Sequence, residues 1–78
     1  MASSTFTPRY KQLLRSLTSA RKAAALSQAA LAERLGRLQT FVSKYERGER
    51  RLDVVEFLDV AEALGLDPCK LLRDLRPR

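Results

Sequence analysis

The sequence predicts a small all-α domain of five short helices, and three observations support this fold class. The chain has 78 residues, enough for one modest hydrophobic core. It holds three Gly and three Pro while 45% of its residues are hydrophobic, a composition that favours compact helical structure. Apolar residues recur at helical spacing, and no run alternates over six or more positions as a half-buried strand would.

The first helix is predicted over residues 8–24, with Thr7 as its cap and Pro8 at the first helical position. Its buried stripe is predicted from the apolar spacing to consist of Leu13, Leu17, Ala20 and Ala24, with Leu14 and Arg21 at the edges. Residues 1–7 are small and polar, and we expect them to form a flexible arm.

Two short helices follow, joined by a tight turn. Ser27 is the predicted cap of the second helix, Gln28 begins it, and Gly36 fits the left-handed conformation that ends a helix. The third helix is predicted over residues 39–47. We interpret residues 26–48 as a helix-turn-helix whose second helix is shaped to enter a DNA groove.

The third helix is divided lengthwise. At 100° per residue, Leu38, Val42 and Tyr45 fall on one side, and Val42 and Tyr45 are expected to face inward with Glu46. The opposite arc is polar or basic without an acid, and it consists of Gln39, Thr40, Ser43, Lys44 and Arg47. Glu46 falls at the edge between the two faces. Because ordinary surface helices mix charge signs, the acid-free arc indicates a polyanionic partner.

Two further helices complete the prediction. Asp53 is expected to cap the fourth, which ends at Gly65. Its predicted buried stripe consists of Val54, Phe57, Leu58, Ala61 and Leu64, and its predicted outer face of Glu56, Asp59 and Glu62. The last helix begins at Asp67–Pro68. Residues 8–75 then form one domain, and residues 76–78 form a basic tail.

The charge distribution also favours a polyanion. The net charge is +6, and residues 1–52 carry 11 Lys/Arg against 3 Asp/Glu, whereas residues 53–78 carry 4 against 6. The partner is therefore expected to meet the first two-thirds of the chain. A generally basic, soluble surface is the plain alternative.

Several function classes lack the residues they require. There is no His and one Cys, Cys69, so we expect no zinc site, no other metal and no disulfide within the monomer. Candidates for acid–base or nucleophilic catalysis are few, so we expect neither an enzyme nor a cofactor. No apolar run has membrane-spanning length and no signal peptide is recognisable, so a cytoplasmic protein without a membrane partner is expected.

Three sequence blocks together carry a family resemblance. They are L-S-Q-x-x-L-A-x-x-L-G at Leu26–Gly36, V-S-x-Y-E-x-G at Val42–Gly48 and A-x-A-L-G at Ala61–Gly65. At this spacing the chain resembles the phage repressor and Cro-like (XRE-type) helix-turn-helix regulators over roughly residues 13–72. The resemblance implies a five-helix lambda-repressor-like fold. It also implies a transcriptional repressor that binds a pseudo-palindromic double-stranded DNA operator as a homodimer.

The resemblance and the acid-free arc together assign residue roles. The expected base-contacting residues are Gln39, Thr40, Ser43 and Lys44. The expected phosphate-contacting residues are Gln28, Arg37, Arg47, Arg50 and Arg51. Arg21 and Glu46 match a structural ion pair of the family. A carboxamide such as that of Gln39 can both donate to and accept from adenine, which supports its assignment.

Two positions depart from the family pattern. Leu38 stands where a small polar cap is usual, so Gln39 or the turn backbone must contribute more of the capping. Phe41 replaces the usual Ser or Thr. We favour a core position for Phe41, with contact to a thymine methyl as the alternative.

The dimer surface is expected on the last segment. Its leucines exceed what this small core obviously needs, and they are Leu66, Leu71, Leu72 and Leu75. The alternative to a repressor is an antitoxin or another protein-binding module of the same fold. Its main partner would be a protein such as a toxin or polymerase, and DNA binding would be secondary.

Overall fold

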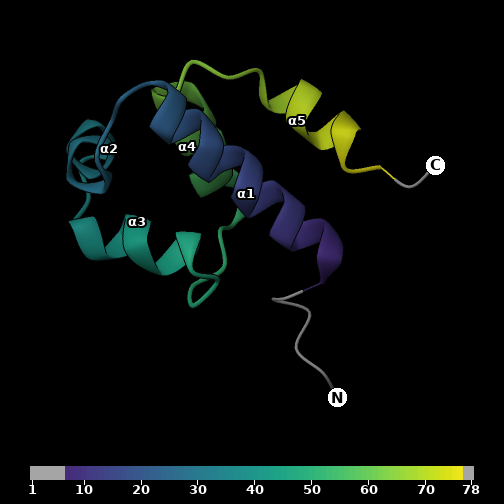
Figure 1. Ribbon diagram of the computed structural model, residues 1–78, viewed down its shortest axis with the longest axis horizontal. Coiled ribbons are helices and arrows are strands. Elements are labelled where there is room, and N and C mark those ends of the chain that lie inside the picture. The colour runs from purple at the N-terminus through teal and green to yellow at the C-terminus, as the bar shows by residue number, and fades with distance from the viewer. Residues whose placement is uncertain (1–6, 77–78) are drawn as a thin grey trace.

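Five helices form where the sequence places caps and turns. The computed structural model describes residues 7–76, and within that range the chain is all-α (Figure 1). The helices are α1 (Pro8–Ala23), α2 (Gln28–Leu35), α3 (Gln39–Glu46), α4 (Val54–Ala63) and α5 (Pro68–Asp74). The predicted fold class is thus confirmed. Apart from Thr7 and Arg76, the predicted arm and tail lie outside the described residues.

Most helix starts have the predicted side-chain cap. Thr7 Oγ1 accepts a hydrogen bond from Tyr10 N over 3.2 Å, and Ser27 Oγ accepts one from Ala30 N over 3.0 Å. Gly36 ends α2 in the left-handed conformation at φ 67°, as predicted. α3 is the exception, because its N-cap residue is Leu38, which offers no side-chain acceptor and is 78% exposed.

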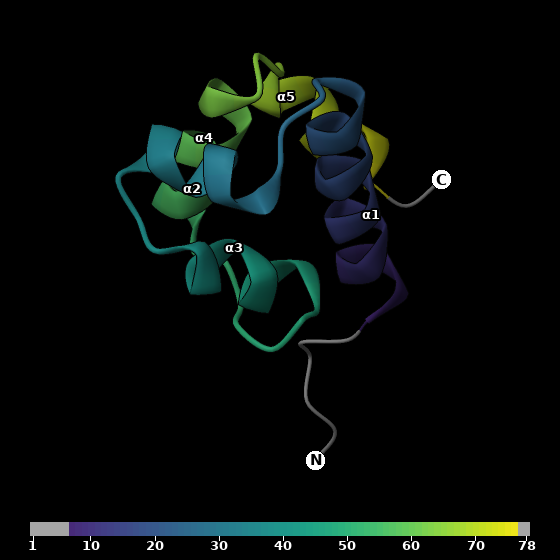
Figure 2. The same ribbon diagram turned by 60° about the vertical axis from the view of Figure 1, so that its left-hand side comes forward.

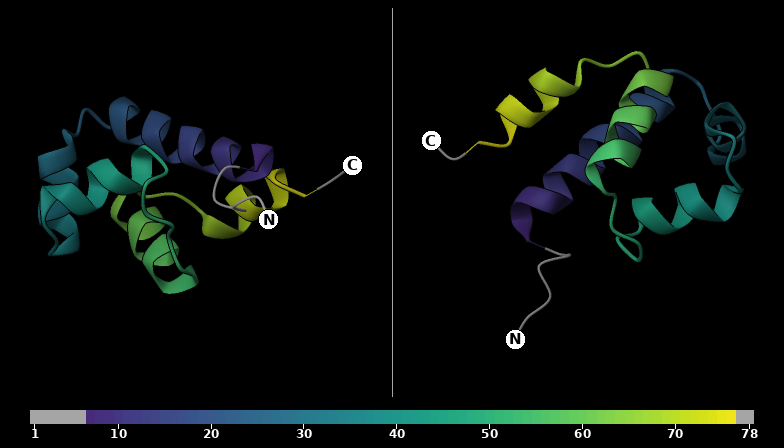
Figure 3. Two further views of the ribbon diagram at one scale, coloured as in Figure 1. Left: turned by 90° about the horizontal axis from the view of Figure 1, so that it is seen from below. Right: turned by 180° about the vertical axis from the view of Figure 1, so that it is seen from behind.

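The arrangement leaves α3 at the edge of the molecule. α2 packs against both α3 and α4, while α3 also contacts α1 and α5 packs on α4. Figure 2 shows α3 beneath α2, with α1 alongside. In the right-hand view of Figure 3, from behind, α4 overlaps α1 and α3 lies at the edge of the molecule. One long side of α3 therefore faces the core and the other faces solvent.

The core joins the first four helices. Its largest fully buried side chains are Tyr45, Leu17, Leu31, Val42 and Val60. Phe41 is only 8% exposed, and its ring meets that of Tyr45 edge-on with centroids 5.5 Å apart. The inward positions predicted for Val42 and Tyr45 are confirmed, and Phe41 occupies the core position that was favoured.

The predicted inner face of α4 was partly wrong. Val54 and Leu58 are 74% and 45% exposed, whereas Glu56, predicted to face outward, is buried. Phe57, Val60 and Ala61 form the inner face instead. Apolar periodicity misplaced the stripe because the buried Glu56 carboxylate is compensated by Arg50 from the preceding loop and by Arg37 from the turn before α3, and periodicity does not register ion pairs.

A smaller correction concerns α1. Ala24, predicted on the buried stripe, is exposed because the helix ends at Ala23 and Ala24 is its C-cap. Of the four leucines expected to be in surplus, three are half-buried against the protein's own core, and these are Leu66, Leu71 and Leu75. Leu72 is 49% exposed.

Among residues 7–76, no helix is long and apolar enough to cross a membrane.

Candidate nucleic-acid interface

Packing on one side of α3 determines which side chains face solvent. Because Val42 and Tyr45 are fully buried, the opposite arc is turned outward. Gln39, Thr40 and Lys44 are all exposed on it. Ser43 is half-buried, and its Oγ donates to Thr40 O over 3.3 Å, so part of its hydrogen-bonding capacity is used within the helix.

Glu46 does not interrupt this arc, because it turns toward α1. Its Oε2 accepts from Arg21 Nε over 2.7 Å and its Oε1 from Arg21 Nη2 over 3.1 Å. The two side chains are only 10% and 6% exposed. Hydrogen bonding to Glu46 raises the pKa of Arg21 although burial acts in the opposite direction. The exposed face of α3 therefore keeps its basic character.

Gln28 is bonded to the same carboxylate. Its Nε2 donates to Glu46 Oε1 over 2.9 Å, and the residue is half-buried. The first residue of α2 is thereby fixed to the last residue of α3. The sequence-based prediction assigned Gln28 to phosphate, and this bond to Glu46 was not foreseen.

Arg37 and Arg50 flank α3 and converge on Glu56 of α4. Arg50 donates from Nη1 to Oε1 over 2.8 Å and from Nη2 to Oε2 over 2.7 Å, while Arg37 Nη2 reaches Oε2 over 3.1 Å. Both guanidinium groups also lie over the Phe41 ring, 4.3 and 4.9 Å from its centroid. We refer to Arg37, Arg50, Glu56 and Phe41 as the arginine clamp.

Sequence reasoning missed the clamp. The available signal was the D-x-x-E pattern of a capping box, in which Asp53 Oδ1 accepts from Glu56 N over 2.7 Å and Glu56 Oε1 accepts from Asp53 N over 3.1 Å. This reciprocal cap holds the Glu56 carboxylate in place. Hydrogen bonds from Arg50, chiefly, and then from Asp53 and Arg37 lower the pKa of Glu56 to about 2.

The remaining predicted phosphate-contacting arginines lie on the loop after α3. Arg47 and Glu49 form an exposed pair, from Nε to Oε2 over 2.9 Å and from Nη2 to Oε1 over 3.1 Å. The hydrogen bond from Arg47 lowers the pKa of Glu49. Arg51 stacks over the Tyr10 ring, 4.6 Å from its centroid. Exposed ion pairs of this kind are weak, so a phosphate can replace the carboxylate.

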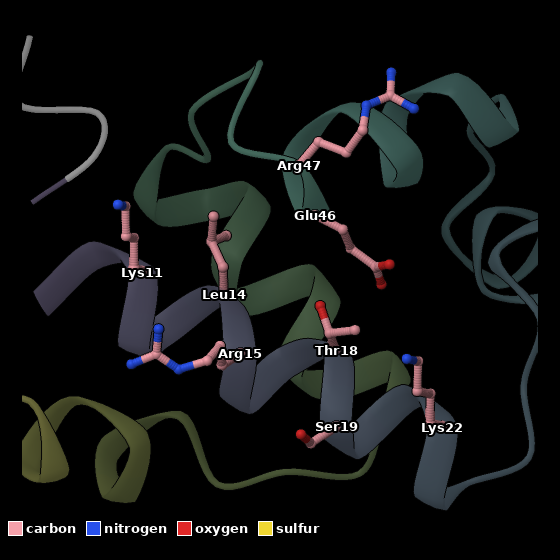
Figure 4. Close-up of a pocket in the computed structure, with 8 residues that line it drawn as sticks. All are labelled: Lys11, Leu14, Arg15, Thr18, Ser19, Lys22, Glu46 and Arg47. Atoms are coloured by element: carbon pink, nitrogen blue, oxygen red, sulfur yellow. The ribbon is translucent and has the colours of Figure 1, made fainter. Parts of the chain in front are cut away.

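A basic groove runs between α1 and the end of α3. It encloses about 470 Å³ and is lined by Lys11, Leu14, Arg15, Thr18, Ser19, Lys22, Glu46 and Arg47. Figure 4 shows the α1 side chains along one wall and Glu46 with Arg47 on the other. α1 contains no acidic residue, so this wall continues the positive charge of α3. The sequence did not reveal that these separate lysines and arginines share one groove.

Comparison with known proteins points to one family. A helix-turn-helix family model matches residues 17–71, which include all of α2 and α3. An XRE-family like protein from Pseudomonas syringae pv. tomato str. DC3000 has a similar solved structure, with 55% sequence identity and a TM-score of 0.83. That alignment covers 86% of this chain and 82% of the other. No curated protein sequence matches the chain.

Two further solved structures are similar. The restriction-modification controller protein C.AhdI from Aeromonas hydrophila is 38% identical with a TM-score of 0.65, over 81% of this chain and 91% of its own. The clp gene regulator ClgR from C. glutamicum is 23% identical with a TM-score of 0.77, over 90% and 91% of the two chains. At that identity, the likeness to ClgR concerns the fold alone.

Proposed function

This chain belongs to the XRE family of helix-turn-helix proteins, and on that basis we propose that it is a transcriptional regulator that binds double-stranded DNA. The exposed, acid-free arc of α3 is the observation that carries the proposal. In this proposal α3 enters the major groove, and the base-contacting residues are Gln39, Thr40, Ser43 and Lys44. An amide, two hydroxyls and an ammonium group offer donors and acceptors suited to base edges.

The surrounding residues are proposed to contact backbone phosphates, which position α3 without reading sequence. These are Gln28, Arg37, Arg47, Arg50 and Arg51. They come from the start of α2, the turn before α3 and the loop after it, so they lie at both ends of the reading helix. Charge supports this assignment, since four of the five are arginines and the first two-thirds of the chain is strongly basic.

We further propose a homodimer that represses transcription from a pseudo-palindromic operator. A single recognition helix reads only a few base pairs, so useful affinity normally requires two helices about one DNA turn apart. The dimer surface is proposed to consist of exposed Leu72 on α5 together with the half-buried Leu66, Leu71 and Leu75. The similar structures include a restriction-modification controller protein at 38% identity, which agrees with a regulatory role.

Selection from a random duplex library, combined with the mass of the selected complex, tests the proposal. We expect enrichment of an inverted repeat with half-sites about one helical turn apart, bound by two protein chains. Enrichment of no sequence would contradict sequence-specific binding and favour the protein-binding alternative. Enrichment of a single half-site bound by one chain would contradict the dimer alone.

A further inference from the structure

The arginine clamp joins α4 to the surface that is proposed to meet DNA. Arg37 and Arg50 border a hollow that is also lined by Thr40 and Lys44, two of the proposed base-contacting residues. The side chains of Arg37 and Arg50 are 42% and 40% exposed, whereas the Glu56 side chain is 8% exposed. A DNA backbone that approached this hollow would meet guanidinium groups already bonded to a buried carboxylate.

We propose that Glu56 increases the sequence selectivity of DNA binding by limiting the contacts that Arg37 and Arg50 can make with backbone phosphates. The inference rests on the proposed function, because selectivity exists only in a protein that reads DNA sequence. Glu56 is assigned a positioning role: it contacts no base, and it acts through the two arginines.

The geometry leaves each arginine limited capacity for phosphate. Arg50 uses both terminal nitrogens on Glu56, and its Nη1 also donates to Arg51 O over 3.3 Å. Arg37 uses Nη2 on the same carboxylate. Both guanidinium groups also lie over the Phe41 ring, so neither can turn toward a phosphate without losing contacts. The carboxylate also reduces the combined charge of the two arginines from +2 to +1.

This reduction weakens non-specific binding more than specific binding. Non-specific affinity comes almost entirely from phosphate contacts and the release of counterions. A protein on random DNA is free to adopt the orientation that gives its arginines the most phosphate contacts. Base contacts fix the orientation of a specific complex, so additional free arginine charge raises its affinity less.

The decisive variant is Glu56→Gln. Glutamine suits the same position of a capping box, so the start of α4 is retained while the negative charge is removed. Glu62→Gln is the matched control, because it removes one negative charge from an exposed position of the same helix. Affinity for the selected operator and for a random duplex is measured for both variants and the wild type over a range of salt concentrations.

Relative to the Glu62→Gln control, we expect Glu56→Gln to bind the random duplex about five-fold more tightly. We also expect a log–log salt slope steeper by about 1 to 2, and a smaller ratio of specific to random affinity. Adding Arg37→Gln to Glu56→Gln should reverse part of the gain. If the wild type is selective but Glu56→Gln and Glu62→Gln bind the random duplex with equal affinity, the role of Glu56 is overturned and the proposed function stands. An unselective wild type would overturn the proposed function and, with it, this inference.

Glu56 is buried, so folding of the variant is checked by thermal melting in the same buffer. If Glu56→Gln is unfolded, Glu56→Asp replaces it, since it retains the charge and the acceptor but has a shorter reach. We expect a smaller gain in random-duplex affinity in the same direction. Unchanged random-duplex affinity in folded Glu56→Asp would then overturn the inference.

Discussion

Arg21 in α1 and Glu46 at the end of α3 form a buried ion pair through two hydrogen bonds of 2.7 and 3.1 Å. Arg21 Nη1 also donates to Leu26 O over 2.8 Å, and Gln28 Nε2 donates to the same glutamate. The pair thus joins α1, the start of α2 and the end of α3. These bonds hold the end of α3 in a fixed position relative to α1 and α2.

Glu46→Ala should destabilise the fold far more than it changes DNA sequence preference. Removing the carboxylate leaves the Arg21 guanidinium buried without its charged partner, which typically costs about 3–5 kcal/mol of unfolding free energy. Urea denaturation measures the loss. Glu49→Ala is the control, because it removes an exposed carboxylate paired with Arg47 and should leave the transition midpoint nearly unchanged. A Glu46→Ala protein that unfolds at the parent midpoint would show that the pair has no structural role.

Gln39→Ala and Lys44→Ala should each reduce affinity for the selected operator by about 1–3 kcal/mol and relax the preference at one base position. Both side chains are exposed on the arc opposite the buried residues, so neither truncation removes core packing. Binding isotherms on the operator and on single-base variants measure the effect. Equal losses on operator and random DNA for Gln39→Ala would be incompatible with base reading by Gln39.

Tyr45→Phe should stabilise the protein by about 1 kcal/mol. The Tyr45 hydroxyl is buried, and among the described residues it has no hydrogen-bond partner. Burial is the main reason that its pKa is raised, and removing an unsatisfied buried hydroxyl relieves a desolvation cost.

Tyr10→Phe is the matched control for this effect. The Tyr10 hydroxyl accepts a hydrogen bond from Leu52 N over 3.1 Å, so its removal should destabilise the protein by about 1 kcal/mol. Thermal or urea denaturation of both variants gives the comparison. A loss of stability in Tyr45→Phe similar to that in Tyr10→Phe would indicate that the Tyr45 hydroxyl has a partner in solution.

The helix boundaries and the inner side of α3 were predictable because local chemistry determines them. Ser27 and Gly36 mark the two ends of α2 through capping and a left-handed turn. Val42 and Tyr45 follow the helical period, so their burial could be read from spacing alone. The position of Phe41 could not be read from spacing alone, because this residue lies between the two faces of α3. It was identified as unusual only by comparison with the family pattern, which has Ser or Thr there.

The capping box of Asp53 and Glu56 is visible in the sequence, but the convergence of Arg37 and Arg50 on Glu56 could not be predicted from it. Glu56 is separated from Arg37 by 19 positions. The two meet only when α2 packs against both α3 and α4. Periodicity treats a glutamate as an outward residue, so it placed Glu56 on the surface and Val54 in the core. Long-range ion pairs can bury a charge at a position where local pattern predicts a surface residue.

The pH dependence of stability should distinguish wild type from Glu56→Gln. The pKa of Glu56 falls from its usual value of 4.5 to about 2 in the folded protein, so the unfolded chain binds a proton more readily between these values. The stabilisation is therefore fully present above about pH 4.5 and disappears as the pH falls toward 2. At neutral pH we expect wild type to be more stable by roughly 2 kcal/mol, since the arginine partners are partly exposed to water.

Urea denaturation at several pH values between about 3 and 7 measures this difference. The difference in unfolding free energy between wild type and Glu56→Gln should narrow as the pH falls below about 4.5, and part of it should remain at pH 3, which is still above the folded-state pKa of about 2. Aspartate and glutamate residues common to both proteins titrate equally, so their contributions cancel in the difference. A constant difference across this range would mean that the Glu56 carboxylate is not stabilised by its arginine partners.

Leu72→Glu should shift the protein from dimer to monomer and weaken operator binding. Leu72 is 49% exposed on α5, so a glutamate at this position can be solvated in the monomer. In the proposed dimer the same glutamate would place a charge in an apolar interface. Light scattering with size-exclusion chromatography measures the mass over a range of concentrations. Val55→Glu is the control, because Val55 is 66% exposed on α4 and the same substitution there lies outside the proposed interface. If Val55→Glu dissociated the dimer and Leu72→Glu did not, the interface would lie on α4 rather than α5.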